Sequence, residues 1–260
     1  MTWNRPSHMQ RSMIQRAAFL AAGLLATLAP AIAATRLPWA SARQMVVVTV
    51  PGWDSTQGQL RTYEQHDGQW REVGTAAPVV IGKGAAWGEG LNEQQSSGPT
   101  KHEGDGRSPA GVFRVGEAFG YAGTAGTAMP YRALSATDYC VDVSGSPLYN
   151  RIVDTRQVGE KAVAGATEAM RRDIHNNGDH AYRRGFVIEH NPDGRIGAGS
   201  CIFAHLWKTP SSPTVGCTAM ADGTMDRLLS WLKPDDNPVI VLLPDAEYAR
   251  LRLAWSLPSP

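Results

Sequence analysis

The chain has 260 residues, of which 42% are hydrophobic and 19% are charged, and its formal net charge is +1. This balance is typical of a globular protein that buries one good core; one domain is expected, and two small ones remain open. Residues 1–33 hold three arginines and no acid, so the remainder carries 22 basic and 24 acidic side chains. A charge near minus two argues against nucleic acid as a partner.

The first residues have the pattern of a secretory signal. Three arginines precede the apolar run AAFLAAGLLATLAPAIAA, which ends in the small-residue triplet Ala31-Ile32-Ala33. Pro30 interrupts the run, which favours cleavage after Ala33 over retention as a membrane anchor. No later stretch is long and apolar enough to span a bilayer, so we expect a soluble protein outside the cytoplasm, where disulfides can form.

After a linker at 34–44, short apolar runs predict a mostly β domain over 45–246, followed by a tail at 247–260. Stretches dense in glycine, proline, serine and asparagine separate the runs. His66-Asp67-Gly68 between two half-apolar runs predicts a hairpin, because Asp and Gly tolerate positive φ. The expected strands are 45–50, 59–65, 69–73, 78–83, 111–115, 138–143, 185–190, 200–207 and 238–243.

Two segments have helical spacing. Residues 157–174 carry a weak apolar stripe, and residues 222–232 carry a stronger one. Asp222 is the expected N-cap of the second helix, and Pro234 is expected to end it.

The segment from Ser200 to Lys233 places a histidine, His205, at the end of a strand and a cysteine, Cys217, before a helix, twelve residues later. A thiol attacks as a thiolate, and its pKa falls beside an imidazole or near the positive end of a helix dipole. Gly216 permits an unusual turn, so neighbouring amides could bind an oxyanion. Spacing alone leaves two readings open, a catalytic pair or a buried cysteine and an ordinary histidine.

Two motifs resemble the YkuD-type L,D-transpeptidase family. Thr214-Val215-Gly216-Cys217 after His205 is similar to the family's [Ser/Thr]-x-Gly-Cys signature. The segment 104–113 resembles its Thr-Pro-x-Gly-x-Phe element, with Ser108 in place of threonine. Together the two motifs span most of residues 45–244.

The resemblance implies a β-sandwich catalytic domain with one or two helices, one of them after the catalytic cysteine. Cys217 would attack a carbonyl beside diaminopimelate in a peptidoglycan stem peptide and form a thioester. His205 would take the thiol proton and later that of the acceptor amine, while Thr214, Val215 and Gly216 would shape the loop and oxyanion site. The family also implies a periplasmic or wall-associated location, acylation by carbapenems, and no cofactor or metal.

Three alternatives follow from the same residues. The acyl group could pass to another stem peptide, making 3,3 or 1,3 cross-links, or to water, as in a carboxypeptidase or amidase. A non-catalytic wall-binding protein is disfavoured because His205 and Cys217 are both present. The sequence departs from the family at Val215, where many members have histidine, and at Ala219, where they have arginine or asparagine. Val215 would have to orient His205 through its backbone carbonyl, and Ala219 leaves substrate recognition open.

The remaining candidates are less specific. Cys140 and Cys201 could pair and leave Cys217 reduced, or stay as separate buried thiols. His190 could line the cleft, although a strand-end histidine bonded to a loop is the favoured interpretation; a zinc site with His205, Cys201 and Cys217 lacks a short chelating pair. Arg151 and Tyr149 are candidates for binding substrate carboxylates. The glycine-rich segment 82–108 is either a lid or a connection.

Overall fold

The computed structural model describes residues 36–259 of the chain. Strands predominate in this part, so the prediction of a mostly β protein is confirmed. The signal sequence predicted over 1–33 lies outside the described residues. Within 36–259, no helix combines the length and the apolar character that crossing a membrane requires.

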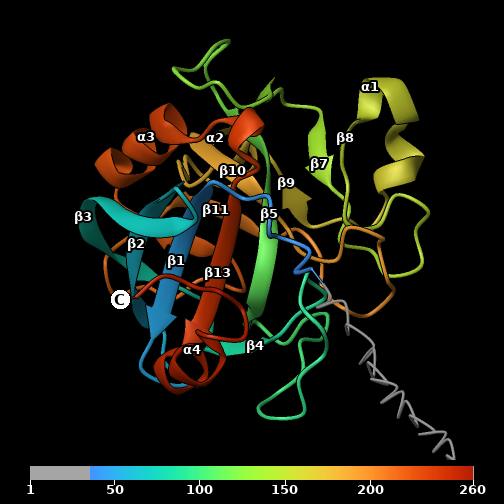
Figure 1. Ribbon diagram of the computed structural model, residues 1–260. Coiled ribbons are helices and arrows are strands. Elements are labelled where there is room, and N and C mark those ends of the chain that lie inside the picture. Colours follow the sequence, from blue (N-terminus) through green and yellow to red (C-terminus); the bar gives the residue numbers. More distant parts are fainter. Residues whose placement is uncertain (1–35, 260) are drawn as a thin grey trace, which may run out of the picture. The chain divides into compact units, whose positions relative to one another are not determined.

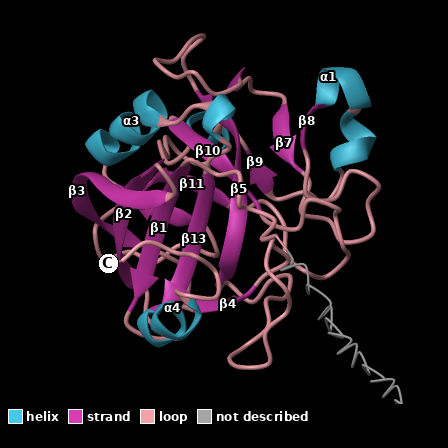
Figure 2. Cartoon of the chain, viewed as in Figure 1, coloured by secondary structure: helices cyan, strands magenta, loops and turns pink. Residues whose placement is uncertain are grey.

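Eight strands form a closed sheet, because β5 and β10 pair and join the two ends of the ladder (Figure 1, Figure 2). β4 (Ala85–Trp87) and β6 (Tyr131–Ala133) add to β5 in parallel, outside this ring. In order around the ring, the strands are β10 (Arg184–Glu189), β11 (Phe203–Leu206), β12 (Thr218–Met220), β3 (Gln69–Val80), β2 (Gln57–His66), β1 (Gln44–Val50), β13 (Val239–Pro244) and β5 (Ser108–Gly120).

A second, three-stranded sheet has the order β8-β7-β9; we call it the small sheet. In Figure 1 it lies to the right of β5. Its strands are β7 (Asp138–Cys140), β8 (Ile152–Asp154) and β9 (Glu168–Ala169).

The continuous helix predicted over 157–174 is wrong. The chain there forms α1 (Thr155–Val158), a 3-10 turn at Glu160–Val163, β9, and then α2 (Arg172–His175). Gly159 and Gly165 have φ values of 83° and 86°, a conformation that ends a right-handed helix.

The predicted hairpin and the predicted helix at 222–232 are confirmed, apart from the helix cap. Asp67 (φ 51°) and Gly68 (φ 76°) form the two-residue turn between β2 and β3. The predicted C-terminal helix is α3 (Asp222–Trp231), but its cap is Ala221, and Asp222 is its first residue. The Asp222 carboxylate instead pairs with Arg183 at 2.7 Å.

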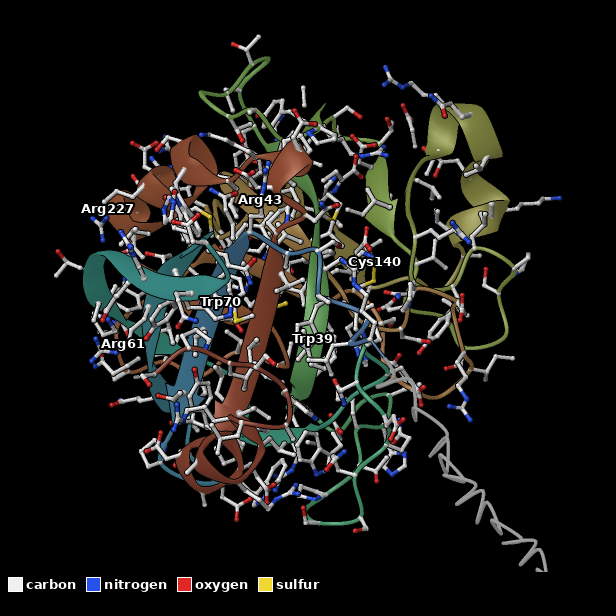
Figure 3. All side chains as sticks on the ribbon, viewed as in Figure 1. Trp39, Arg43, Arg61, Trp70, Cys140 and Arg227 are labelled. Carbon is white, nitrogen blue, oxygen red and sulfur yellow. A yellow bond between two sulfur atoms is a disulfide. The ribbon has the colours of Figure 1, made fainter. Side chains whose placement is uncertain are left out.

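Both ends of the described part pack on the core. The boundary expected between 246 and 247 falls inside α4 (Asp245–Leu251). The Trp39 indole N–H donates to the Trp255 carbonyl at 3.0 Å, and the two rings meet edge to face with centroids 5.5 Å apart. Figure 3 shows Trp39 among the side chains that fill the molecule. The segments expected to be a linker and a tail therefore contribute to the core.

Candidate active site

β11 and β12 bring His205 and Cys217 into one cavity. The two strands are parallel neighbours in the closed sheet, and His205 is in register with Ala219. Cys217 directly precedes β12, so it lies beside the strand that carries His205. Both side chains line a cavity of about 230 Å³.

The backbone carbonyl of Cys217 is held by both sequence motifs. Thr214 Oγ1 donates to this carbonyl at 2.6 Å, and Ser108 Oγ donates to it at 3.1 Å. Ser108 is fully buried, and its hydroxyl also accepts the N–H of Gly82 at 3.0 Å. The segment around Ser108 is therefore part of the support of Cys217, although it lies 109 residues away in sequence.

The residue before the cysteine has a conformation and a setting that require glycine. Gly216 has a φ of 139°, and a Cβ at this position would lie 3.1 Å from Ile202 Cδ1 and 3.2 Å from the Arg107 carbonyl. Its N–H donates to Thr214 Oγ1 at 3.2 Å. Val215, by contrast, is 77% exposed at the mouth of the cavity.

The Cys217 thiol lies between two backbone groups. Its Sγ accepts the N–H of Phe203 at 3.3 Å, and the thiol donates to the carbonyl of Cys201 at 3.6 Å. Burial, and after it the negative charge of Glu168, raises the pKa of Cys217 to about 12. The thiol is therefore protonated at neutral pH.

His205 is neutral and has one nitrogen free to take a proton. Burial lowers the pKa of His205 to about 4. Its Nδ1 donates to the Leu206 carbonyl at 2.8 Å, which leaves Nε2 as the proton acceptor. The orienting carbonyl is thus that of Leu206 and not that of Val215, because the side chain folds back on its own strand. Within residues 36–259, His205 and Cys217 share no hydrogen bond, and catalytic hydrogen bonds often tighten only with substrate.

One wall of the cavity consists of charged and aromatic residues that the sequence did not indicate as functional. Arg172 pairs with Glu168 at 3.0 Å and with Asp179 at 2.8 Å. Its guanidinium lies 5.2 Å from the centre of the Tyr182 ring, and that ring meets His205 edge to face at 5.2 Å. Burial raises the pKa of Glu168, against the opposing effect of Arg172. These residues belong to no motif, and no spacing signal identifies them.

Three candidates lie away from this cavity. His190 and Arg151 line a different cavity of about 460 Å³. The His190 ring nitrogen Nε2 donates to the Ala198 carbonyl at 2.9 Å, and burial lowers the pKa of His190 to about 4. Tyr149 is buried, and its hydroxyl donates to Glu103. The structure does not bring these three side chains to Cys217.

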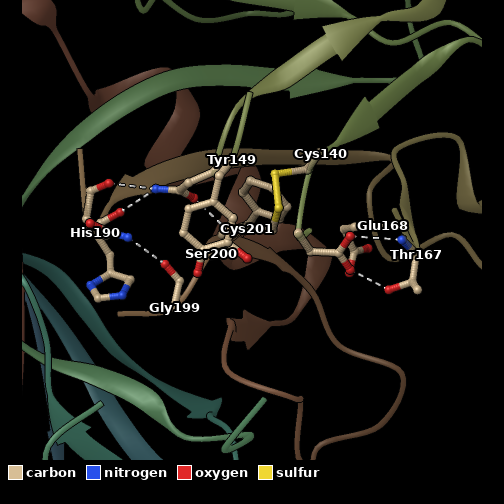
Figure 4. The surroundings of a disulfide bond; sticks show 12 residues. Cys140, Tyr149, Thr167, Glu168, His190, Gly199, Ser200 and Cys201 are labelled. Atoms are coloured by element: carbon tan, nitrogen blue, oxygen red, sulfur yellow. Dashed lines mark hydrogen bonds between the residues drawn. A yellow bond between two sulfur atoms is a disulfide. The ribbon is translucent and has the colours of Figure 1, made fainter. Parts of the chain in front are cut away.

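A disulfide joins Cys140 to Cys201, and Cys217 is the free cysteine of the described part. Figure 4 shows the disulfide between Tyr149 and Ser200 on one side and Glu168 on the other. With Cys201 oxidised, the four residues of the zinc alternative do not form a ligand set. Residues 36–259 contain no group of three or more His, Cys, Asp or Glu side chains arranged to hold a metal.

The segment 82–108 is tied to the body of the protein and lines no part of the Cys217 cavity. Lys101 is buried and pairs with Asp105 at 2.5 Å. Glu103 accepts hydrogen bonds from Ser200 Oγ, at 2.7 Å, and from Tyr149. The segment is therefore a packed connection beside the residues that precede β11.

Comparisons with known proteins add little to this geometry. No protein-family model and no curated protein matches the chain. Among solved structures it is similar to "Structure of Bdellovibrio bacteriovorus Bd1075", with a TM-score of 0.37 and 13% sequence identity. The match covers 83% of this chain and 55% of that one, so this chain spans about half the length of its neighbour. A likeness at this level assigns neither a fold family nor an activity.

Proposed function

We propose that this protein is an exported cysteine acyltransferase, an L,D-transpeptidase of the YkuD type that acts on peptidoglycan stem peptides. The observation that carries the proposal is the convergence of the two motifs: Ser108 and Thr214 both donate to the carbonyl of Cys217, whose side chain shares a cavity with His205. Family membership, the β-sandwich catalytic domain and the periplasmic or wall-associated location belong to the same proposal.

The chemistry starts from a neutral thiol and a neutral imidazole. A substrate carbonyl beside Cys217 would be attacked by Sγ while the thiol proton passes to His205 Nε2. The Phe203 N–H, which already donates to Sγ, stabilises the negative sulfur. The Cys217 N–H has no acceptor within residues 36–259, so it is available to the developing oxyanion.

The intermediate then resolves in a second step. Collapse of the tetrahedral intermediate breaks the peptide bond, and His205 returns the proton to the leaving amine. The resulting thioester is attacked by the amine of a second stem peptide, which loses its proton to His205 and restores the Cys217 thiol. Water in place of the amine would make the same site a hydrolase.

The side chains that line the cavity favour a substrate with both a positively and a negatively charged group. The basic side chains of Arg172 and Lys208 and the carboxyl groups of Glu168 and Asp179 line the same space. Diaminopimelate presents an ammonium and a carboxylate on one carbon, which can meet such a wall. These side chains would recognise the substrate in this chain, which has Ala219 where the similar family carries arginine or asparagine.

The test is incubation of the mature protein with diaminopimelate-containing tetrapeptides or purified sacculi, followed by mass analysis of the products. We expect cross-linked dimers that disappear in Cys217→Ala and in His205→Ala but persist in His66→Ala, a matched change at an exposed histidine. Free tripeptide in place of dimers would assign the hydrolase, and the bond in the dimer distinguishes 3,3 from 1,3 links. Unchanged substrate and no carbapenem adduct on reduced Cys217 would refute acyl transfer.

A further inference from the structure

The thiol of Cys217 forms hydrogen bonds with a short backbone segment, residues 201–203. The Phe203 N–H donates to Sγ and favours the thiolate, whereas the Cys201 carbonyl accepts the S–H proton and favours the thiol. Within residues 36–259 this carbonyl has the Cys217 thiol as its hydrogen-bond donor and no other. The Cys201 carbonyl is therefore a fixed acceptor that helps the thiol keep its proton, in addition to burial.

Cys201 holds an uncommon backbone conformation. Its φ is 56°, in the left-handed region that residues with a side chain seldom occupy unless their surroundings hold them there. Its N–H donates to Asn150 Oδ1 at 2.8 Å, and the preceding Ser200 is held by Glu103. Its side chain is fixed by the disulfide to Cys140.

The other end of the disulfide is fixed in the small sheet. Cys140 lies in β7, the central strand, and is in register with Glu168 of β9. Glu168 in turn lines the cavity of Cys217 and raises the pKa of that thiol. The disulfide thus joins Cys201, whose carbonyl contacts the thiol, to the strand that pairs with the strand of Glu168; Figure 4 shows Cys140, Cys201 and Glu168.

We propose that the Cys140–Cys201 disulfide is a positioning element for Cys217: it holds the Cys201 carbonyl against the thiol, so that the reactivity of Cys217 depends on the oxidation state of this pair. Reduction by a dithiol converts the disulfide to two thiols and the reagent to its own disulfide. The Cys201 carbonyl is then no longer held in place, so the S–H loses a fixed acceptor and water gains access to the sulfur. The lost acceptor and the access of water both favour the thiolate.

The first test is the pH dependence of Cys217 alkylation by iodoacetamide, followed on the Cys217 peptide by mass spectrometry. We expect the midpoint for Cys140→Ala/Cys201→Ala to lie about one pH unit below that of the native chain, the effect of one lost hydrogen bond. Thr167→Ala is the matched control, since it removes the hydrogen bond from the Thr167 hydroxyl to Asp142 beside the small sheet and leaves the disulfide intact. Equal midpoints in the double variant and the native chain would overturn the proposal, and so would an equal shift in the control.

A second measurement avoids the possibility that the double variant does not fold. The native protein is equilibrated in buffers of graded dithiol and disulfide content, and each sample is scored for the Cys140–Cys201 bond and for the alkylation rate of Cys217. We expect the alkylation rate of Cys217 at pH 8 to increase in proportion to the reduced fraction. In the fully reduced protein it should be about tenfold higher, which corresponds to a shift of the midpoint by one pH unit. A constant rate across all reduced fractions, with the near-UV circular dichroism retained, would contradict the proposal.

This inference concerns the same cysteine as the proposed function but does not need the acyl transfer to occur. If stem peptides are not substrates, the alkylation midpoints still decide whether the disulfide positions the thiol. If the midpoints do not differ, the product analysis above still decides the reaction.

Discussion

At the scale of single residues, the site is defined by groups that burial keeps neutral. The pKa of Cys217 is raised and that of His205 is lowered, and burial is the largest cause of both shifts. A thiol and an imidazole in this state exchange a proton only when a substrate arrives, in contrast to a preformed ion pair. The sequence located both residues and could not give this protonation state, because burial depends on the whole fold.

The buried histidines predict a loss of stability in mild acid. His190 and His205 have pKa values of about 4 in the folded protein against 6.5 in an unfolded chain, so the unfolded chain binds more protons between these values. The contribution of the two neutral histidines to the unfolding free energy is fully present above pH 6.5. It is lost as the pH drops towards 4, by about 3 kcal/mol for each histidine.

Melting temperatures measured from pH 7 to pH 4 test this expectation. His205→Gln and His190→Gln should each give a shallower dependence on pH than the native chain, with His66→Gln as the matched control at an exposed position. If the slope is the same in all four proteins, the buried histidines do not titrate as described.

Ser108 gives a second prediction at this scale. Ser108→Ala removes a donor to the Cys217 carbonyl and the acceptor of the buried Gly82 N–H, so we expect a loss of about 1–3 kcal/mol in unfolding free energy. Acylation of Cys217 by a carbapenem should slow by about tenfold, because its carbonyl keeps only the Thr214 hydroxyl. Urea unfolding and stopped-flow acylation measure the two effects.

Ser108→Thr is the rescue variant, since threonine retains the hydroxyl and is the residue found in the similar family motif. It should recover most of the acylation rate that Ser108→Ala loses. Equal rates in the alanine variant and the native chain would show that the two motifs meet without supporting the nucleophile.

At the scale of elements, the important unit is the turn between β11 and β12. It returns the chain from His205 and places Cys217 directly before β12, the parallel neighbour of the strand that carries His205. Gly216 in this turn has a positive φ, and a Cβ there would make tight contacts of 3.1 and 3.2 Å with its neighbours. The sequence predicted the role of this glycine from its freedom at φ, and the structure adds the close approach of Ile202 and of the Arg107 carbonyl.

Gly216→Ala should therefore disturb both stability and the site. We expect about 1–3 kcal/mol lower unfolding free energy and loss of carbapenem acylation, because the strained turn moves Cys217. Gly123→Ala is the matched control, since that glycine has a negative φ and nothing within 4 Å of its missing Cβ. Normal acylation in Gly216→Ala would mean that the turn does not set the position of the thiol.

The elements that were not predicted are the short ones. β8 and β9 have three and two residues, too few to show a period of two, and glycines interrupt the apolar stripe at 157–174 that was read as a helix. Arg172 and Glu168 lie in this misread segment. Glu168 is placed by the pairing between β7 and β9, which no local pattern encodes, and Arg172 pairs with it.

At the scale of the whole molecule, the order of strands could not be predicted beyond neighbours in sequence. The β2–β3 hairpin follows from Asp67-Gly68, whereas the closure of the ring depends on pairing β5 with β10, a non-local contact. The same closure brings the 108 and 217 segments together through Ser108. Motif matching could name both segments as functional, but only the folded chain shows that they touch.

The central claim is that Cys217 carries the acyl group, and trapping that intermediate tests it most directly. The mature protein is mixed with a diaminopimelate-containing tetrapeptide, quenched in acid during turnover, digested, and analysed by mass spectrometry. We expect the acyl mass on the peptide that contains Cys217, sensitive to hydroxylamine and absent from Cys217→Ala. Turnover by the Cys217→Ala variant, or an acyl group on any other residue, would contradict the claim.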